Sequence, residues 1–586
     1  MHLFLNIKKK ARLCFLLIIP YAFIYTNIWL NKSTPTHDAA YYLATSLSVF
    51  QTYEKSGTLA ALSQGYRERF YKPTLTPILS VPFYILSNGN TLWSRTLYAL
   101  FFSTFLIFGI YRLFKIFLKE ETILATAIFS TLPPVVIEYG RNWQELSWLA
   151  IIFTVFSILL RPNIFKLIPQ SIMLGTLVGI AICIRPVLTV LTLLPPFLYV
   201  ISNSNLPSNT KKLTITIFTP FLGVAACGLL NLTQISTQKA LLLSMVGAIL
   251  IAVTIRKIKS AGACLSVFLS GSIALIWHGP FLTMLTSWVI FGGFGEVGKL
   301  SGGQIAPGWT DYLSVTFSNN FGYLGFALFG LGATLAIMSR AKQLNKKMVT
   351  LLSSVPIVFI FGLITTYNEP RFAYFYSWVI LIVSLVIIFQ SVKRPIRLTG
   401  VIMIAAMIQS GALIASQTDP TVFDRVSGIF RLPGNYLFYL ERPIERQEKQ
   451  MALLQELNRV KAHGECPRFA FVSYSIGRYF PDLDQLDLFA KELNFCYELD
   501  YPVYDFSVSS AKDVFELLKP NYDYILLGPV SGKPDLAWQI IQKPFFESLF
   551  REIEAKRLPQ IKSLKNLEIK MDTSDRINNY YLIPLY

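Results

Sequence analysis

The sequence predicts a polytopic α-helical membrane protein with a soluble α/β domain at its C-terminus. Of the 586 residues, 53% are hydrophobic, 14% aromatic and only 15% charged, and the mean hydropathy is +0.48. A soluble globular protein of this length normally carries more charge. Apolar runs of roughly the 20 residues that cross a bilayer recur up to residue 416. Beyond it acidic, basic and apolar residues mix, so we divide the chain into domains 1–416 and 417–586.

The formal net charge of +19 does not indicate nucleic-acid binding. Lys and Arg fall in short clusters between the apolar runs, as they do in the cytoplasmic loops of membrane proteins. The basic segment Lys8–Arg12 precedes the first apolar run and predicts a cytoplasmic N-terminus. No small-residue cleavage site follows that run, so we expect a retained helix over Leu13–Leu30 rather than a signal peptide.

The apolar runs and basic clusters together predict about thirteen transmembrane helices. An odd number places domain 417–586 on the extracytoplasmic side. Two assignments stay open, because Leu177–Val200 could be one helix kinked at Pro186, and Trp277–Phe291 could be re-entrant. If exactly one span fails, the C-terminal domain changes sides. The predicted spans are Leu13–Leu30, Thr91–Tyr111, Thr122–Ile137, Leu146–Leu160, Leu167–Ile184, Val187–Ile201, Leu213–Leu232, Leu241–Ile255, Gly262–Ile290, Phe321–Met338, Val349–Thr366, Phe372–Phe389 and Leu398–Ser416.

The first predicted external loop, residues 31–90, is too long for a simple turn. It contains apolar stretches too short to cross a bilayer, such as Leu75–Leu86, which we expect along the membrane interface. It opens with a helix-like run, Thr36–Leu47, around Asp38. A carboxylate just outside the hydrocarbon can act as a general base where a membrane-bound substrate meets a polar one, or it can cap the helix that starts near Ala39.

The C-terminal domain shows short β-like runs alternating with amphipathic stretches. No Gly-rich phosphate loop follows a predicted strand, which argues against a Rossmann cofactor site. Cys466 and Cys496 could pair in an extracytoplasmic domain or remain two free thiols. Apart from Asp38 beside His37, the histidines His37 and His278 have no ligand partners at metal-binding spacing, so we do not expect a structural metal site. We predict helices over Glu445–Ala462, Leu483–Leu493 and Ala511–Leu518, and strands over Phe469–Ser473, Tyr524–Leu527 and Tyr580–Leu582.

Four short motifs occur in a fixed order with consistent sidedness, and this order resembles a known family. The chain is similar to the GT-C superfamily of polyprenyl-phosphate-sugar-dependent glycosyltransferases, and above all to its protein O-mannosyltransferase-like and lipid A aminoarabinose transferase-like branch. The resemblance covers Leu13–Ser416. The motifs are Asp38-Ala39-Ala40-Tyr41-Tyr42 after the first helix, Lys72-Pro73-Thr74-Leu75, Arg141 with Glu145 four residues later, and Arg371 before a late span.

The resemblance implies a catalytic role for Asp38 as the base that takes the acceptor's proton. It implies that Lys72, Arg141 and Arg371 hold the donor phosphate, and that Glu145 orients Arg141 or the acceptor. The family usually has a glutamate where this chain has an alanine directly after the aspartate, which leaves open whether a second acid or a divalent cation takes part.

Each basic residue also has a purely structural interpretation. Lys72 could extend its ammonium to the interface, and Arg371 could pair with the neighbouring Glu369. Arg141 could form an ion pair with the residue four positions on in a helix. Arg185, before a proline, matches a basic position of the family and is implied to be another phosphate ligand, although it too could reach the interface.

Taken together, the sequence predicts an integral-membrane glycosyltransferase of the bacterial inner membrane. It would transfer a hexosyl or pentosyl unit from a polyprenyl-phosphate donor to a lipid, glycan or protein acceptor on the extracytoplasmic face. Donor, acceptor and membrane lipids are the expected partners. A transporter or flippase of a lipid-linked glycan is the alternative, although no clear internal repeat is present. A third candidate is a scaffold of a polysaccharide-export complex.

Overall fold

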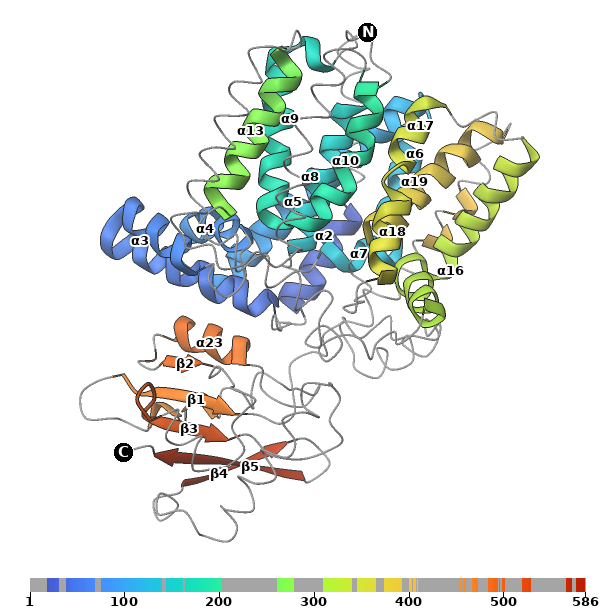
Figure 1. Ribbon diagram of the computed structural model, residues 1–586. Coiled ribbons are helices and arrows are strands. Elements are labelled where there is room, and N and C mark those ends of the chain that lie inside the picture. Colours follow the sequence, from blue (N-terminus) through green and yellow to red (C-terminus); the bar gives the residue numbers. More distant parts are fainter. Residues whose placement is uncertain are drawn as a thin grey trace, which may run out of the picture.

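The computed structural model shows a helical bundle with a small α/β domain beneath it, and a long helix, α3 (Asp38–Glu68), between the two (Figure 1). The structure describes residues 18–30, 38–68, 75–139, 144–161, 164–202, 261–278, 309–339, 345–364, 374–392, 400–402, 404–406, 408, 453–455, 457–459, 466–472, 483–493, 495, 498–500, 519–527, 565–571 and 576–584.

The first predicted external loop is largely helical. Helix α3 accounts for much of it and is broken at Gly57, where φ is 80°. Helix α4 (Thr76–Leu86) is the predicted short apolar helix, and a proline in its first turn suits a position with no N–H partner. The Ser46 hydroxyl on α3 donates a 2.8 Å hydrogen bond to the carbonyl of Pro77, which ties the two helices together.

Most described bundle helices lie where the sequence predicts spans. Three predicted spans are interrupted. Thr122–Ile137 divides before Pro133, because proline in a helix interior lacks the N–H donor, and Val349–Thr366 divides at the turn Ser353–Ser354. Phe321–Met338 is kinked near its start at Gly322, where φ is 63°. The predictions for 213–255 and 279–308 lie outside the described residues. The helices are α2 (Ile18–Ile24) with the π-helical turn η1 (Tyr25–Leu30), α5 (Thr91–Phe117), α6 (Thr122–Ser130), α7 (Pro133–Tyr139), α8 (Gln144–Leu159), the 3₁₀ turn η2 (Ile164–Lys166), α9 (Ile168–Ile184), α10 (Pro186–Ser202), α13 (Ala261–His278), α16 (Trp309–Met338), α17 (Lys346–Leu352), α18 (Val355–Ile364) and α19 (Tyr374–Ser391).

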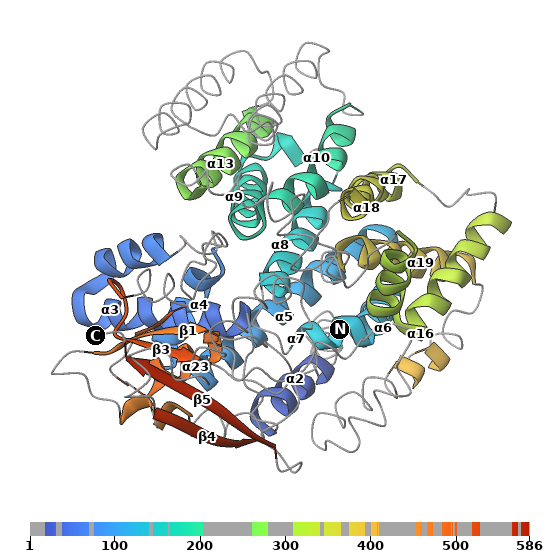
Figure 2. The ribbon, with the colours of Figure 1, turned by 60° about the horizontal axis from the view of Figure 1, so that its bottom comes forward.

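An aromatic core lies between α6, α8 and α19. Figure 2 shows where these helices lie in the bundle. Trp378 of α19 is fully buried, and its ring centroid lies 6.1 Å from that of Phe153 on α8 and 5.6 Å from that of Phe129 on α6. Among the described helices, α5 and α19 are long and apolar enough to cross a bilayer. In lipid such helices associate mainly through close van der Waals packing, so large interlocking rings stabilise the bundle.

The C-terminal domain is built on a mixed sheet. The strands β1 (Arg468–Val472), β2 (Glu498–Asp500), β3 (Tyr524–Leu527), β4 (Lys565–Met571) and β5 (Arg576–Pro584) take the order β2-β1-β3-β5-β4. Strand β1 is parallel to both neighbours, whereas β5 is antiparallel to β3 and β4. Helix α23 (Leu483–Glu492) connects the parallel strands β1 and β2, and Figure 1 shows it on the side of the sheet that faces α3.

The predicted C-terminal elements over Phe469–Ser473, Leu483–Leu493, Tyr524–Leu527 and Tyr580–Leu582 coincide with β1, α23, β3 and β5. Strands β2 and β4 were not predicted, since β2 is only three residues long and β4 is mixed in polarity. The described parts of Glu445–Ala462 are helical, and Ala511–Leu518 lies outside the described residues.

A close approach of α5 and α8 at Gly109 gives a test of the packing. A Cβ atom added to Gly109 would lie 2.8 Å from the Thr154 hydroxyl oxygen and 3.0 Å from the Thr154 backbone nitrogen. We expect Gly109→Ala to destabilise the bundle by about 1–3 kcal/mol, because the helices must separate. Gly330→Ala on α16 is the matched control, since nothing lies within 4 Å of its added Cβ. Thermal unfolding in detergent should show a lower midpoint for the first variant only.

Candidate active site

The break between α9 and α10 creates an unusual demand for hydrogen bonds inside the bundle. In a continuous helix the N–H of residue 186 would bond the Ile182 carbonyl, but Pro186 has no N–H. Arg185, with φ −140° and ψ 85°, stands between the two helices. A buried carbonyl without a donor costs free energy, and more so in a membrane, where no water replaces the donor. Other segments must therefore supply donors here.

Two segments far apart in the sequence supply these donors. The His278 side chain, at the end of α13, places Nε2 3.1 Å from the Ile182 carbonyl oxygen, so this nitrogen carries the proton. The backbone N–H of Leu75 donates a 3.0 Å hydrogen bond to the Cys183 carbonyl. Leu75 is the last residue of the Lys-Pro-x-Leu motif. The motif of the first loop and the helix break are therefore joined directly.

The charge at the break is balanced by α8. Arg185 forms an ion pair with Glu145, and the two side chains are 8% and 2% exposed. A buried guanidinium and carboxylate are costly to desolvate, and each is tolerated because it neutralises the other. Glu145 lies in the first turn of α8, where a negative charge also complements the helix dipole.

The start of α19 contacts Trp148, which lies beside the helix break. The Trp148 indole N–H donates a 2.7 Å hydrogen bond to the Thr189 hydroxyl, one turn after Arg185. The ring of Phe375 on α19 lies edge-on to Trp148, with a centroid separation of 6.1 Å. The beginnings of α8, α10 and α19 therefore converge on the helix break.

The structure brings together two of the six residues singled out from the sequence. Glu145 meets Arg185, which the sequence could not show, since it offered only the nearby Arg141 as a partner for the glutamate. Lys72, Arg141 and Arg371 lie outside the described residues. Asp38 is the first residue of α3, and its side chain is likewise outside what the structure describes.

Sequence reasoning passed over three polar groups that the structure buries. Glu138 on α7 and Arg95 on α5 are 0% and 5% exposed. His278 was considered only as a metal ligand, whereas its ring bonds the broken helix. The available signal was a charged residue within an apolar span, as at Arg95. The described residues contain no group of three or more His, Cys, Asp or Glu side chains that could hold a metal ion.

Comparison with known proteins finds a relationship in structure only. No family model and no curated relative matches the sequence. The crystal structure of ArnT from Cupriavidus metallidurans bound to undecaprenyl phosphate superposes over 98% of this chain and 97% of its own, with a TM-score of 0.51 and 10% identity. The chain has the GT-C fold.

Two further solved structures match at lower similarity. ArnT from the same organism in the apo state covers 96% of each chain with a TM-score of 0.49 and 10% identity. The oligosaccharyltransferase AglB from Archaeoglobus fulgidus, in complex with an inhibitory peptide and a dolichol-phosphate, is 11% identical with a TM-score of 0.42. It covers 89% of this chain and 70% of its own.

The buried ion pair makes a stability prediction. Glu145→Gln should destabilise the GT-C bundle by about 3–5 kcal/mol, because it leaves the Arg185 charge buried without its partner. Arg185→Met should cost less, because the carboxyl group that remains can take up a proton. The double variant should recover most of the loss, since both charges are then absent. Thermal unfolding in detergent measures all three.

The partly exposed pair of Asp487 and Lys491, separated by 2.8 Å, provides the control. Lys491→Met should change stability by only about 0–1 kcal/mol, since a partly exposed ion pair contributes little. A double variant at the buried pair that is as unstable as Glu145→Gln would show that the charges are not the cause.

Proposed function

We propose that this protein is a GT-C glycosyltransferase that moves a sugar from a polyprenyl-phosphate carrier to a hydroxyl of a lipid, glycan or protein on the extracytoplasmic face of a bacterial inner membrane. The observation that carries the proposal is the helix break at Arg185. There the end of the Lys-Pro-x-Leu motif, the first turn of α8 and the first turn of α19 meet. Leu75, Glu145 and the helix that follows Arg371, which are far apart in sequence, thus border one buried, charged position.

The described residues that follow Lys72 and Arg371 in the sequence support donor-phosphate binding by these two cations. Lys72 lies three residues before Leu75, and Arg371 three residues before α19. Three residues of chain reach at most about 11 Å. We therefore assign both residues, with Arg141 and Arg185, to the donor phosphate. A guanidinium carries five N–H donors, so one arginine can pair with a carboxylate and a phosphate together.

Glu145 takes a more specific role than the sequence offered. Its carboxylate pairs with Arg185, and so we propose that it orients this cation toward the phosphate. Cations fixed in advance stabilise the charge that develops on a leaving group in a poorly hydrated site. The ArnT structure with undecaprenyl phosphate, which has the same fold, is consistent with a lipid-phosphate ligand.

The proposed reaction is a single displacement at the anomeric carbon. Asp38 removes the proton from the acceptor hydroxyl, whose oxygen then forms the new bond to the anomeric carbon. The bond from that carbon to the phosphate oxygen breaks, and polyprenyl phosphate leaves with the electron pair. Asp38 is the first residue of α3. Two helical turns further along α3, the Ser46 hydroxyl donates a hydrogen bond to the carbonyl of Pro77, two residues after Leu75. The helix that begins with Asp38 and the helix that follows Leu75 are thus directly connected, which supports this assignment.

The extracytoplasmic side is supported by a cysteine in the C-terminal domain. Cys466 is disulfide-bonded, and Cys496, its expected partner, lies outside the described residues. Disulfides persist in oxidising compartments and are rare in the cytosol.

Sidedness can be measured at this disulfide. On intact spheroplasts, a membrane-impermeant maleimide should label Cys466 only after treatment with an impermeant reductant. Cys183, which is buried in α9, should stay unlabelled under the same conditions. Labelling of Cys466 only after lysis would place the domain in the cytoplasm and would overturn the proposed orientation.

The catalytic assignment is tested by Asp38→Asn. With a polyprenyl-phosphate sugar and candidate acceptors, this variant should lose sugar transfer by about 10²-fold or more, while it still binds the donor, because only the proton acceptor is removed. Arg371→Ala should instead weaken donor binding. Glu54→Gln is the matched control, since Glu54 lies exposed on the same helix. Transfer at the normal rate by Asp38→Asn would reject Asp38 as the base.

The same experiment separates the enzyme from a transporter. A transporter or flippase of lipid-linked glycan would bind the phosphate with the same cations but would form no new glycosidic bond. Movement of the labelled donor across a vesicle membrane, without a glycosylated product, would favour that alternative. A scaffold would lose function when domain 417–586 is removed but not in Asp38→Asn.

A further inference from the structure

Helices α9 and α13 pack closely along their lengths, and Figure 1 and Figure 2 show them side by side. Gly175 and Gly179 are one turn apart on α9. Cβ atoms added to them would lie 2.5 Å from the Ser266 carbonyl oxygen and 2.8 Å from the Ile273 Cβ of α13. The Ser266 hydroxyl also donates a 2.8 Å hydrogen bond to the Ser171 carbonyl. Paired glycines of this kind let two helix backbones approach closely in a membrane.

The close packing brings the end of α13 to the helix break. The contacts follow the same order along both helices, from Ser171 and Ser266 at one end to Ile182 and His278 at the other. The two helices are therefore parallel, and both end at the break. His278 is buried there, with 5% of its surface exposed. Its bond to the Ile182 carbonyl is therefore shielded from solvent.

Each of the last carbonyls of α9 has a donor of its own. The Ala181 carbonyl accepts the Arg185 backbone N–H at 2.9 Å and the Thr189 hydroxyl at 2.9 Å. The Cys183 carbonyl uses the backbone N–H of Leu75, as described above. A backbone N–H carries a single proton, so neither amide can serve the carbonyl between them as well. Among these described donors, the ring that bonds Ile182 is the side chain that comes from a helix outside the break.

The bond from His278 removes a competitor for Arg185. Without it the Ile182 carbonyl would lack the donor that Pro186 cannot supply, and a buried carbonyl takes up any donor within reach. Arg185 follows three residues later and carries five side-chain N–H groups. Loss of the histidine should therefore let the guanidinium turn toward this carbonyl and away from Glu145, its partner in the structure.

We propose that His278 is a positioning residue for the donor phosphate. By supplying the N–H that Pro186 lacks, it fixes the backbone that carries Arg185 and keeps the guanidinium on Glu145, directed at the phosphate. The inference rests on the proposed function, because only there is Arg185 a phosphate ligand. Cations fixed in advance stabilise a leaving group best, so a loosened Arg185 costs both affinity and rate.

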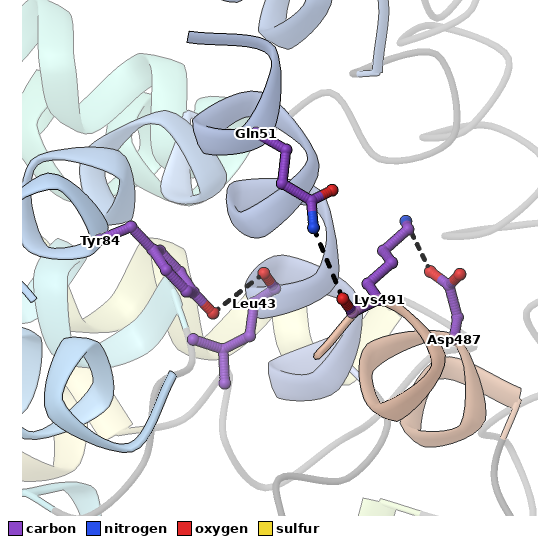
Figure 3. Close-up of polar contacts among 5 residues, drawn as sticks. All are labelled: Leu43, Gln51, Tyr84, Asp487 and Lys491. Atoms are coloured by element: carbon purple, nitrogen blue, oxygen red, sulfur yellow. Dashed lines mark hydrogen bonds and ion pairs between the residues drawn. The ribbon is translucent and has the colours of Figure 1, made fainter. Parts of the chain in front are cut away.

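The helix that begins with the proposed base is held by contacts from α4 and α23. The Tyr84 hydroxyl of α4 donates a 3.2 Å hydrogen bond to the Leu43 carbonyl of α3 (Figure 3). The Gln51 side chain of α3 donates a 3.4 Å hydrogen bond to the Lys491 carbonyl of α23, and Leu488 packs in the same apolar cluster as Leu43. A change at the helix break should therefore affect the donor and leave the KM of the acceptor unchanged.

The experiment uses the full-length protein in nanodiscs and has two readouts, the affinity for purified polyprenyl phosphate and the steady-state kinetics of sugar transfer. His278→Met removes the donor at similar volume, and His278→Gln keeps an amide N–H that reaches about as far as Nε2. His278→Asn, whose amide is one carbon shorter, replaces His278→Met if that variant does not fold. Ser266→Ala is the matched control, because it removes a bond from α13 to an α9 carbonyl at the far end of the same helix pair.

We expect His278→Met to weaken polyprenyl phosphate binding about 10-fold and to lower kcat by about 10- to 100-fold, since a displaced cation loses much of its effect. The KM of the acceptor should not change. His278→Gln should recover most of both losses, and Ser266→Ala should behave as wild type. Combined with Arg185→Met, His278→Met should weaken binding no further than Arg185→Met alone, because the histidine acts through that arginine.

The outcomes separate a positioning role from a structural one. A residue that only stabilised the fold would lower the folded fraction, and with it kcat, but the molecules that remain folded would keep their affinity for polyprenyl phosphate. Wild-type affinity and kcat in His278→Met would therefore overturn the proposal. Equal losses in His278→Met and Ser266→Ala would reject it as well, and so would losses that add in full to those of Arg185→Met.

The proposed function fails in a different way. If wild type binds polyprenyl phosphate but forms no glycosylated product, the transferase assignment is wrong, while weaker binding by His278→Met would still establish the positioning role. If wild type neither binds polyprenyl phosphate nor transfers sugar, both proposals are rejected.

Discussion

The missing N–H of Pro186 is the constraint on which the rest of the bundle depends. It leaves the Ile182 carbonyl without its helical donor in a region where water cannot replace one. His278 meets that need, and Leu75 bonds the next carbonyl along. Arg185 faces Glu145 at the same point. The helix break thus brings α8, α9, α10, α13 and the first loop together around one buried ion pair. Such an arrangement is expected of a functional site.

Apolar packing and polar contacts occupy different parts of the structure. The aromatic core around Trp378 makes the bundle rigid and carries no chemistry. Polar side-chain contacts join segments at the helix break, through Trp148 and Thr189, and at the first loop, through Tyr84 and Leu43. Both sets of polar contacts involve the first loop. The helix break bonds it at Leu75, and the Tyr84 hydroxyl bonds it at Leu43. The loop is therefore held at both of its helices, and α3 is fixed relative to the ion pair of Arg185 and Glu145.

The helices could be predicted from the sequence because hydropathy and length decide them. The predicted boundaries of the spans around α5, α8 and α9 agree with the structure to within a few residues, apart from the longer C-terminal end of α5. The breaks at Pro133 and at Ser353–Ser354 were missed, since a continuous apolar run hides a local interruption.

The partners of the site residues could not be predicted, because they depend on tertiary packing. Glu145 had a suitable arginine four residues before it, and nothing in the spacing favours Arg185 instead. His278 has no recognisable motif for bonding a helix end. Leu488 lies in an ordinary amphipathic helix, and only the placement of α23 against α3 shows that it packs with Leu43 and Leu47.

The bend of α3 at Gly57 has a consequence for what the chain can tolerate there. With φ at 80° and ψ at −178°, the residue adopts the mirror image of an ordinary extended conformation, and no atom lies within 4 Å of an added Cβ. The requirement is therefore one of handedness and not of size. A D-alanine introduced by chemical ligation would satisfy it, whereas any L-residue would favour a different path for the second half of the helix.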